Sequence, residues 1–92
     1  MKRFACIYTM IDIERSNAER PVHVAYLRSL LDAGKIETGW KFPHYEAGAL
    51  QGMLVCNAET KEEVEEWFRK DPVIVCGART FEVREALPMS LG

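Results

Sequence analysis

The sequence predicts an α+β fold of the ferredoxin-like kind, a four-stranded antiparallel sheet with two helices on one face. The first observation is the order of the patterns along the chain, which alternate between strand and helix periods as strand, helix, strand, strand, helix, strand. The second is that the 92 residues contain no repeat or linker, which indicates a single domain over residues 1–92. Right-handed crossovers then place both helices on the same side of the sheet.

The first strand and the first helix are predicted from residue types and capping signals. Residues 3–10 are rich in β-branched and aromatic side chains, as strands are. Ser16 and Glu19 have the spacing of a capping box, and Pro21 suits a first helical turn. Gly34 can take the left-handed conformation that ends many helices. We therefore expect a helix that begins between Ser16 and Pro21 and ends at Gly34.

The middle of the chain is predicted to contain two strands and a loop between them. Residues 35–40 are a short strand candidate, and residues 51–58 are apolar enough for a central strand. Residues 41–50 contain a proline and a glycine and have the composition of an exposed loop. We expect this loop to form either a lid or the tip of a β-hairpin.

A second helix and a last strand complete the predicted fold. Thr60 forms a capping box with Glu63, and three apolar residues then recur at helical spacing, Val64, Trp67 and Phe68. A short turn or helix over residues 73–78 should lead to a final strand over residues 79–87. No further helix is long enough to cover the other face of the sheet. We therefore expect a homodimer in which two sheets pair as a dimeric α/β barrel.

Composition and charge exclude several classes of partner. The hydrophobic share of 48% and the charged share of 28% are those of a soluble globular protein. A formal net charge of -2, without a run of lysine or arginine, does not suit a nucleic-acid partner. The apolar run near the start is too short for a signal peptide or a membrane span. We expect a cytoplasmic protein without a membrane or nucleic-acid partner.

The residue spacing does not indicate a metal or nucleotide site. Cys6, Cys56 and Cys76 lack the paired spacings of zinc and redox motifs, and we interpret them as reduced, buried hydrophobic residues. The glycines do not form a phosphate-binding pattern, and the acidic cluster of the second helix is typical of a solvated helix face. We expect neither a metal nor a cofactor.

His23 is aligned with the apolar residues of the first helix. Helical steps from it reach three leucines, Leu27, Leu30 and Leu31, so the imidazole should face the core. One further helical step along the apolar stripe of the second helix reaches a carboxylate, Asp71, which should also point toward the interior. In the predicted fold the two helix ends approach one another, at a packing distance of about 8 to 10 Å that two side chains can bridge. The sequence therefore predicts a dyad of His23 and Asp71.

Each member of this dyad also has a structural interpretation. A histidine on an apolar helix face is often a structural residue that is buried with its hydrogen bonds satisfied. Asp71 before Pro72 is typical of a cap on the following helical turn. As a pair, the carboxylate favours the charged imidazole and fixes its tautomer, which suits general acid and base catalysis near neutral pH. Both interpretations stay open from the sequence.

Other residues are candidates for binding a substrate beside the dyad. Arg20 can hold an anionic or phenolic oxygen, with an exposed ion pair as the alternative. Four ring side chains can line an aromatic pocket between the sheet and the loop: Tyr8, Trp40, His44 and Tyr45. Core packing is the alternative role for Tyr8 and Trp40, and simple exposure is the alternative for Tyr45.

Two segments of the chain resemble the YCII-related family, small ferredoxin-like proteins of the dimeric α/β-barrel type. They are RPVHVAYLRSLLDAGKI and GALQGMLVCNAETKEEVEEWFRKDPVIVCGARTFEV. The most specific parts are the Arg-Pro-x-His opening of the first helix, the glycine that closes it, and Asp-Pro with a glycine five residues beyond the proline. The active-site pair proposed for that family falls on Asp71 and His23. The chain departs from the family after Gly39, where Trp40 and Lys41 replace the common Gly-Pro.

The resemblance implies acid-base chemistry on small molecules. Reactions assigned in the family include loss of hydrogen chloride from chlorinated aromatic intermediates, and similar folds include lactone isomerases, cofactor-free monooxygenases and haem-handling proteins. A cofactor-free lyase or isomerase of a cyclic or aromatic oxygenated compound, such as a dehydrochlorinase, is therefore the first expectation. His23 would move the proton and Asp71 would orient it. Two alternatives stay open, a non-catalytic dimeric module that binds a small ligand or a protein, and a haem enzyme with His23 as the axial ligand.

Overall fold

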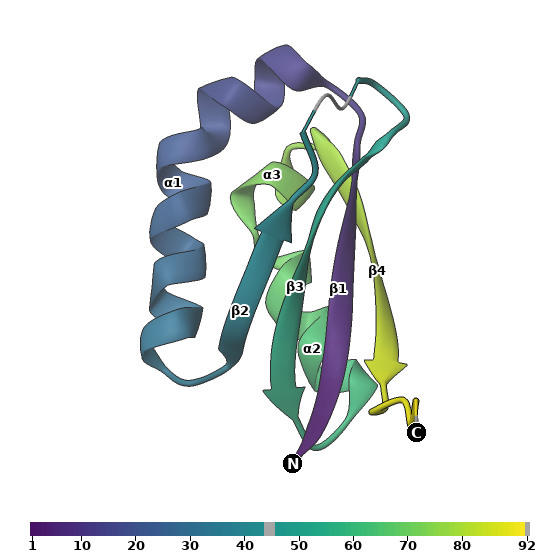
Figure 1. Cartoon of the computed structure of the whole chain (residues 1–92). Helices are drawn as coiled ribbons and strands as arrows, with labels where there is room; N and C mark the ends of the chain where they lie inside the picture. Colours follow the sequence, from purple (N-terminus) through teal and green to yellow (C-terminus); the bar gives the residue numbers. More distant parts are fainter. Residues whose placement is uncertain (44–45, 92) are drawn as a thin grey trace.

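The computed structural model describes residues 1–43 and 46–91 and has the predicted order of elements, with one short helix before the last strand (Figure 1). The four strands are β1 (Lys2–Met10), β2 (Ile36–Lys41), β3 (Leu50–Ala58) and β4 (Arg79–Ala86). The three helices are α1 (Ile13–Asp32), α2 (Lys61–Arg69) and α3 (Pro72–Val75).

The strands form one antiparallel sheet in the order β2-β3-β1-β4. In Figure 1, α2 and α3 lie behind the sheet, and α1 runs beside the edge strand β2. The burial along β1 alternates, so that every second side chain, from Phe4 to Met10, faces the helices and is buried. This arrangement confirms the predicted α+β, ferredoxin-like fold.

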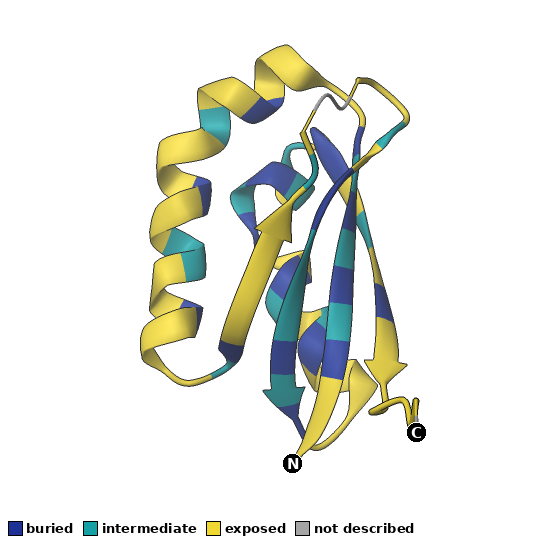
Figure 2. Cartoon of the chain, viewed as in Figure 1, coloured by how far each residue is buried: buried dark blue, intermediate teal, exposed yellow. Residues whose placement is uncertain are grey.

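The core lies mainly between the central strands and the short helices. In Figure 2 the buried segments gather on β1, β3, α2 and α3, whereas α1 and β2 are exposed over most of their length. The fully buried apolar core includes Cys6, Cys56, Val64, Phe68 and Val73. Because α1 buries so little apolar surface, its position depends on a few specific contacts.

The start of α1 differs from the prediction. Its cap is Asp12, whose carboxylate accepts a hydrogen bond from the backbone N–H of Arg15 at 3.0 Å. Ser16 lies inside the helix instead, where its hydroxyl accepts a hydrogen bond from Nε of Arg79, and Pro21 lies in the helix interior. The predicted capping box was wrong because an equally good capping residue precedes it and because Ser16 is held by the sheet.

The apolar stripe of α1 faces the core only in part. His23 and Leu30 are buried and Leu27 is half-buried, but Leu31 is 44% exposed. The prediction was wrong for Leu31 because α1 packs along the edge of the sheet and not over its centre. Gly34 has a φ of 76° just beyond the helix, in agreement with its predicted role.

The second helix and the cysteines agree closely with the predictions. Thr60 caps α2 and accepts a hydrogen bond from the backbone N–H of Glu63 at 3.3 Å. All three cysteines are free thiols; Cys6 and Cys56 are buried as predicted, whereas Cys76 is only half-buried. No helix in the described ranges is both long and apolar enough to cross a membrane.

The loop between β2 and β3 is shorter than predicted, because Lys41 belongs to β2 and Leu50 to β3. His44 and Tyr45, two of the predicted pocket residues, lie outside the described residues. The two strands approach closely at Gly52, where an added Cβ would lie 2.5 Å from the carbonyl oxygen of Trp40. A residue without a side chain is therefore required at this position.

We predict that Gly52→Ala destabilises the fold by about 1–3 kcal/mol, because the new methyl group would push β2 away from β3. Thermal unfolding would measure the change. Gly39→Ala is the matched control, since the atom nearest its added Cβ is the end of the Leu54 side chain, which can rotate. Its loss of stability should be smaller. A Gly52→Ala protein with the same melting temperature as the wild type would contradict the close approach of the strands.

Candidate functional site

The structure brings His23 and Asp71 into direct contact. Nδ1 of His23 lies 2.8 Å from Oδ1 and 3.0 Å from Oδ2 of Asp71. Only 7% of the His23 side chain and 0% of the Asp71 side chain are exposed. α1 supplies the histidine and the junction between α2 and α3 supplies the aspartate, so the site is formed only when these elements pack together.

Asp71 uses its carboxylate for three interactions at once. Oδ1 accepts a hydrogen bond from the backbone N–H of Val73 at 3.2 Å, which caps α3. Oδ2 accepts a hydrogen bond from the hydroxyl of Tyr8 at 2.5 Å, and both oxygens face Nδ1 of His23. The capping interpretation and the dyad interpretation of Asp71 are therefore compatible. Together these donors compensate a charge that has no contact with water.

Tyr8 lies both in the pocket wall and in the buried core, the two positions considered for it from the sequence. It contributes to the pocket wall, but its hydroxyl donates to Asp71 and its ring stands edge-on to that of His23 at 5.9 Å between centroids. Burial raises the pKa of the Tyr8 phenol, and the charge of Asp71 raises it further, whereas Arg79 lowers it. Tyr8 therefore stays protonated and holds the aspartate from the sheet side.

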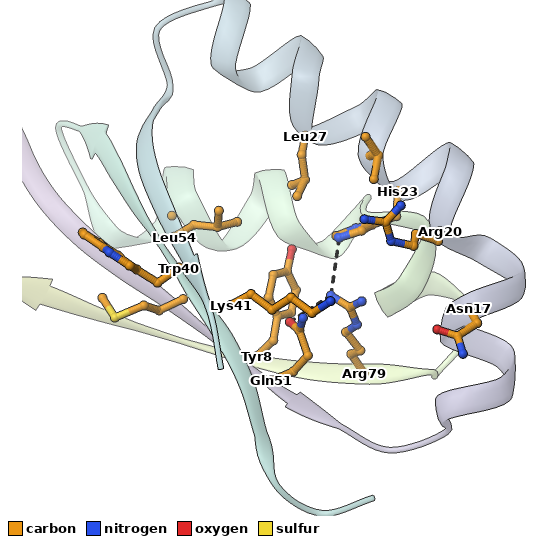
Figure 3. A pocket seen from close by; sticks show the side chains of 13 residues that line it. Tyr8, Asn17, Arg20, His23, Leu27, Trp40, Lys41, Gln51, Leu54 and Arg79 are labelled. Atoms are coloured by element: carbon orange, nitrogen blue, oxygen red, sulfur yellow. Dashed lines mark hydrogen bonds between the residues drawn. The ribbon is translucent and has the colours of Figure 1, made fainter. Parts of the chain in front are cut away.

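Arg79 is a site residue that the sequence reasoning missed. It is buried at the start of β4, and its Nη1 lies 3.4 Å from Nε2 of His23 and 3.1 Å from Oε1 of Gln51 (Figure 3). Its Nε donates to the hydroxyl of Ser16 at 3.0 Å, and its Cζ lies 5.3 Å from the centroid of the Tyr8 ring. The guanidinium is thus held in one orientation beside the imidazole.

The contact with Arg79 assigns the tautomer of His23. A guanidinium can only donate hydrogen bonds, so Nε2 of the imidazole must accept. The ring proton then resides on Nδ1, where Asp71 accepts it. In this tautomer the lone pair of Nε2 is directed away from Asp71 and toward Arg79.

The sequence contained a pattern that could have placed Arg79 in the site, whereas it contained no such pattern for Gln51. Arg79 lies on the same face of β4 as Phe81 and Val83, and strand alternation alone would have aimed it at the helices. Gln51 lies where the register between β1 and β3 shifts, next to Tyr8. Such an irregularity reverses the expected alternation and has no local sequence signal.

The site opens into a pocket with a volume of about 390 Å³, within the usual range for small-molecule sites (Figure 3). Arg20 and Trp40, two of the candidate substrate-binding residues, line it. Arg20 lies within α1, and Trp40 is 57% exposed, so the alternative role of Trp40 in the core was wrong. The remaining walls come from Asn17, Val24, Leu27, Gly39, Lys41, Met53 and Leu54. Within residues 1–43 and 46–91, no cluster of three or more potential metal ligands is present.

Comparison with known proteins identifies the family. The YCII-related domain matches residues 1–90, and the chain belongs to this family, as the sequence resemblance predicted. No curated protein matches the chain. Among solved structures, the chain is similar to 5-chloro-2-hydroxyhydroquinone dehydrochlorinase from Burkholderia phenoliruptrix AC1100, in a complex with 2,5-dihydroxybenzoquinone.

The likeness to that dehydrochlorinase extends over most of both chains. It covers 88% of this chain and 90% of the other, with a TM-score of 0.68 and 21% sequence identity. At this identity the likeness establishes the ferredoxin-like fold.

We predict that the protein loses stability as the pH rises above about 9. Burial raises the pKa of the Cys56 thiol to about 12, and burial also raises the pKa of Cys6 and of Tyr8 above their ordinary values of 9.0 and 10.0. These groups stay protonated in the fold, whereas the unfolded chain ionises at the ordinary values. Their contribution to stability is therefore complete below pH 9 and is lost progressively above it.

Thermal unfolding between pH 7 and 11 measures this loss. Tyr8→Phe should make the decline above pH 10 less steep, because the phenol no longer ionises in the unfolded chain. The same substitution should cost about 1–2 kcal/mol at pH 7, since Asp71 loses a donor. A melting temperature that does not change between pH 8 and 11 would disprove the prediction.

Proposed function

We propose that the protein is a cofactor-free enzyme that catalyses proton transfer, a lyase or isomerase of a small cyclic or aromatic oxygenated compound. The observation that carries this proposal is the buried chain of hydrogen bonds from Tyr8 through Asp71 to Nδ1 of His23. It orients the imidazole in the tautomer that has its lone pair on Nε2, at the wall of a pocket of suitable size. Such an imidazole is a general base.

In this mechanism, Nε2 of His23 removes a proton from a hydroxyl or carbon of the substrate. The imidazolium that forms is stabilised by the negative charge of Asp71, 2.8 Å from Nδ1. In an isomerase, His23 returns the proton to another position of the substrate. In a lyase such as a dehydrochlorinase, a C–Cl bond breaks and its electron pair leaves with chloride, so that the substrate loses one proton and one chloride ion. The cations lining the pocket would stabilise the negative charge that develops on a substrate oxygen.

The similarity to a dehydrochlorinase favours the lyase form of this proposal. That protein is described as acting on a chlorinated hydroquinone and was solved with a dihydroxybenzoquinone. Both compounds are single oxygenated rings, a size that suits a pocket of about 390 Å³. We therefore propose loss of hydrogen chloride from a chlorinated, oxygenated ring as the first reaction to test.

We predict that His23→Gln lowers turnover by about 10²–10⁴-fold, because the amide cannot accept and return a proton. Chloride release from 5-chloro-2-hydroxyhydroquinone, and isomerisation of small lactones, would measure this. Asp71→Asn should also lower turnover, because it removes the charge that stabilises the imidazolium. Glu66→Gln is the control, since Glu66 forms an exposed ion pair with Arg69 on α2 and should leave the rate unchanged. Full turnover by His23→Gln would refute the proposal.

A non-catalytic ligand-binding module is the second candidate. It is favoured by the fact that Asp71 also caps α3 and is fully buried, so that the pair has a structural role regardless of catalysis. In this case His23→Gln and Asp71→Asn would lower the melting temperature, and the wild type would not turn over any of these substrates. Removing one partner of a buried pair typically costs about 3–5 kcal/mol. Comparing the rate and the melting temperature of the same variants separates the two candidates.

We also propose that two copies pair through the face of the sheet that is turned away from the helices. Ile7 and Trp40 are both paired in register with Met53, and Val55 follows Met53 on the same face of β3. These apolar side chains lie on the opposite face of the sheet from the buried side chains of β1 that face the helices. Pairing two such faces would give the dimeric α/β barrel expected from the sequence.

We predict that Val55→Lys converts a dimer into a monomer, because it places a charge at the centre of the paired sheets. Sedimentation at micromolar concentration should show twice the chain mass of 10.5 kDa for the wild type and a single chain mass for the variant. Val75→Lys is the matched control, because Val75 is 71% exposed on α3, on the helical side of the sheet. A monomeric wild type would contradict the proposal.

A further inference from the structure

The polar side of the His23 pocket is rich in positive charge. Arg20 from α1, Lys41 from the end of β2 and Arg79 from the start of β4 all contribute to its wall (Figure 3). The described residues that line the pocket include no aspartate or glutamate. Asp71 lies behind His23, where its two oxygens already accept hydrogen bonds from three donors. The pocket therefore attracts anions.

Arg79 is held in position to bind such an anion. Its Nε donates to the hydroxyl of Ser16 and its Nη1 donates to Oε1 of Gln51. These two contacts hold the guanidinium in a fixed orientation at the pocket wall. A planar guanidinium in a fixed orientation matches the geometry of a carboxylate and loses little side-chain entropy when it binds one.

The opposite side of the pocket is apolar and gives the ligand a second property. Val24, Leu27 and Leu54 line it. In Figure 3, Leu27 is drawn above Arg79 and Leu54 to its left, so both lie away from the guanidinium. An inorganic anion would leave this apolar surface without a partner, whereas an organic anion would cover it. The pocket thus combines a cationic side with a hydrocarbon side.

We propose that the pocket binds a small organic carboxylate, with the carboxylate on Arg79 and Lys41 and the hydrocarbon part against Leu27 and Leu54. The proposal rests on the proposed function, because it names the substrate class of the same pocket. It adds one step to the mechanism. The carboxylate takes over the Nη1 hydrogen bond that Arg79 now gives to Nε2 of His23, and the lone pair of Nε2 becomes available to the ligand.

Calorimetric titration of the full chain with benzoate, benzamide and inorganic phosphate tests the proposal. Benzoate and benzamide have nearly the same shape, so a difference in affinity reports the charge. We expect benzoate to bind about tenfold or more tightly than benzamide, the effect of one charge-assisted hydrogen bond. Phosphate should not displace benzoate at equal concentration. Benzamide or phosphate binding as tightly as benzoate would overturn the proposal.

Two substitutions locate the anion. Lys41→Gln should weaken benzoate about tenfold and leave benzamide unchanged, and Arg79→Lys should weaken benzoate at least as much because the forked geometry is lost. Lys61→Gln is the matched control, since Lys61 is half-exposed at the start of α2 and pairs with Glu65. Because Arg79 is buried, its variant is checked by circular dichroism, while Lys41 is exposed. Unchanged benzoate affinity in Lys41→Gln would overturn the assignment.

The loss of the hydrogen bond from Arg79 to Nε2 of His23 when the ligand binds can be measured separately by NMR. The nitrogen-15 NMR signal of Nε2 should shift when the protein is saturated with benzoate and should stay in place with benzamide. An unchanged signal at saturation with benzoate would overturn this step.

The failure of this proposal can be distinguished from failure of the proposed function, because binding is measured without turnover. If benzoate shows the expected preference but His23→Gln keeps full turnover, the acid-base function fails and the carboxylate site stands. If turnover depends on His23 but benzoate and benzamide bind equally, the function stands and the substrate is neutral.

Discussion

The burial of Asp71 is the constraint on which the site depends. Taking a carboxylate out of water costs several kcal/mol, and this cost is offset only while its hydrogen-bond donors remain in place. The donors come from three elements: Tyr8 on β1, His23 on α1 and the backbone of Val73 on α3. Each element that moves away leaves part of the charge uncompensated. One buried charge therefore couples the sheet, the long helix and the short helix.

The attachment of α1 shows the same dependence on polar contacts. Only Ser16, His23 and Leu30 of this helix are buried, and they are separated by seven residues, or about two helical turns. Ser16 contacts Arg79, His23 contacts Asp71, and Leu30 enters the apolar core. Two of the three buried side chains of this 20-residue helix thus form hydrogen bonds with charged groups. The helix is positioned by the same residues that form the candidate site.

Local patterns were sufficient to predict the order of the elements and the approach of His23 and Asp71, because helical phase and capping act within a few residues. The start of α1 was not predictable in this way, since both Asp12 and Ser16 are good caps and the choice between them depends on Arg79. Arg79 itself enters the site through the long-range pairing of Met10 with the first residue of β4. The contacts that could not be predicted are therefore those fixed by strand register, because they join residues that are far apart in the sequence.

The alternation of β1 has a consequence for how this strand can evolve. Tyr8 points into the site, while its neighbours Ile7 and Thr9 point to the opposite face of the sheet. Consecutive positions thus meet separate requirements, one set for the geometry of the candidate site and the other for the character of the outer surface. Single substitutions can adjust either set independently. An insertion or deletion of one residue would turn each of these side chains to the opposite face of the sheet, and would disrupt the site and the outer surface together. The length of β1 is therefore expected to change far less than its composition.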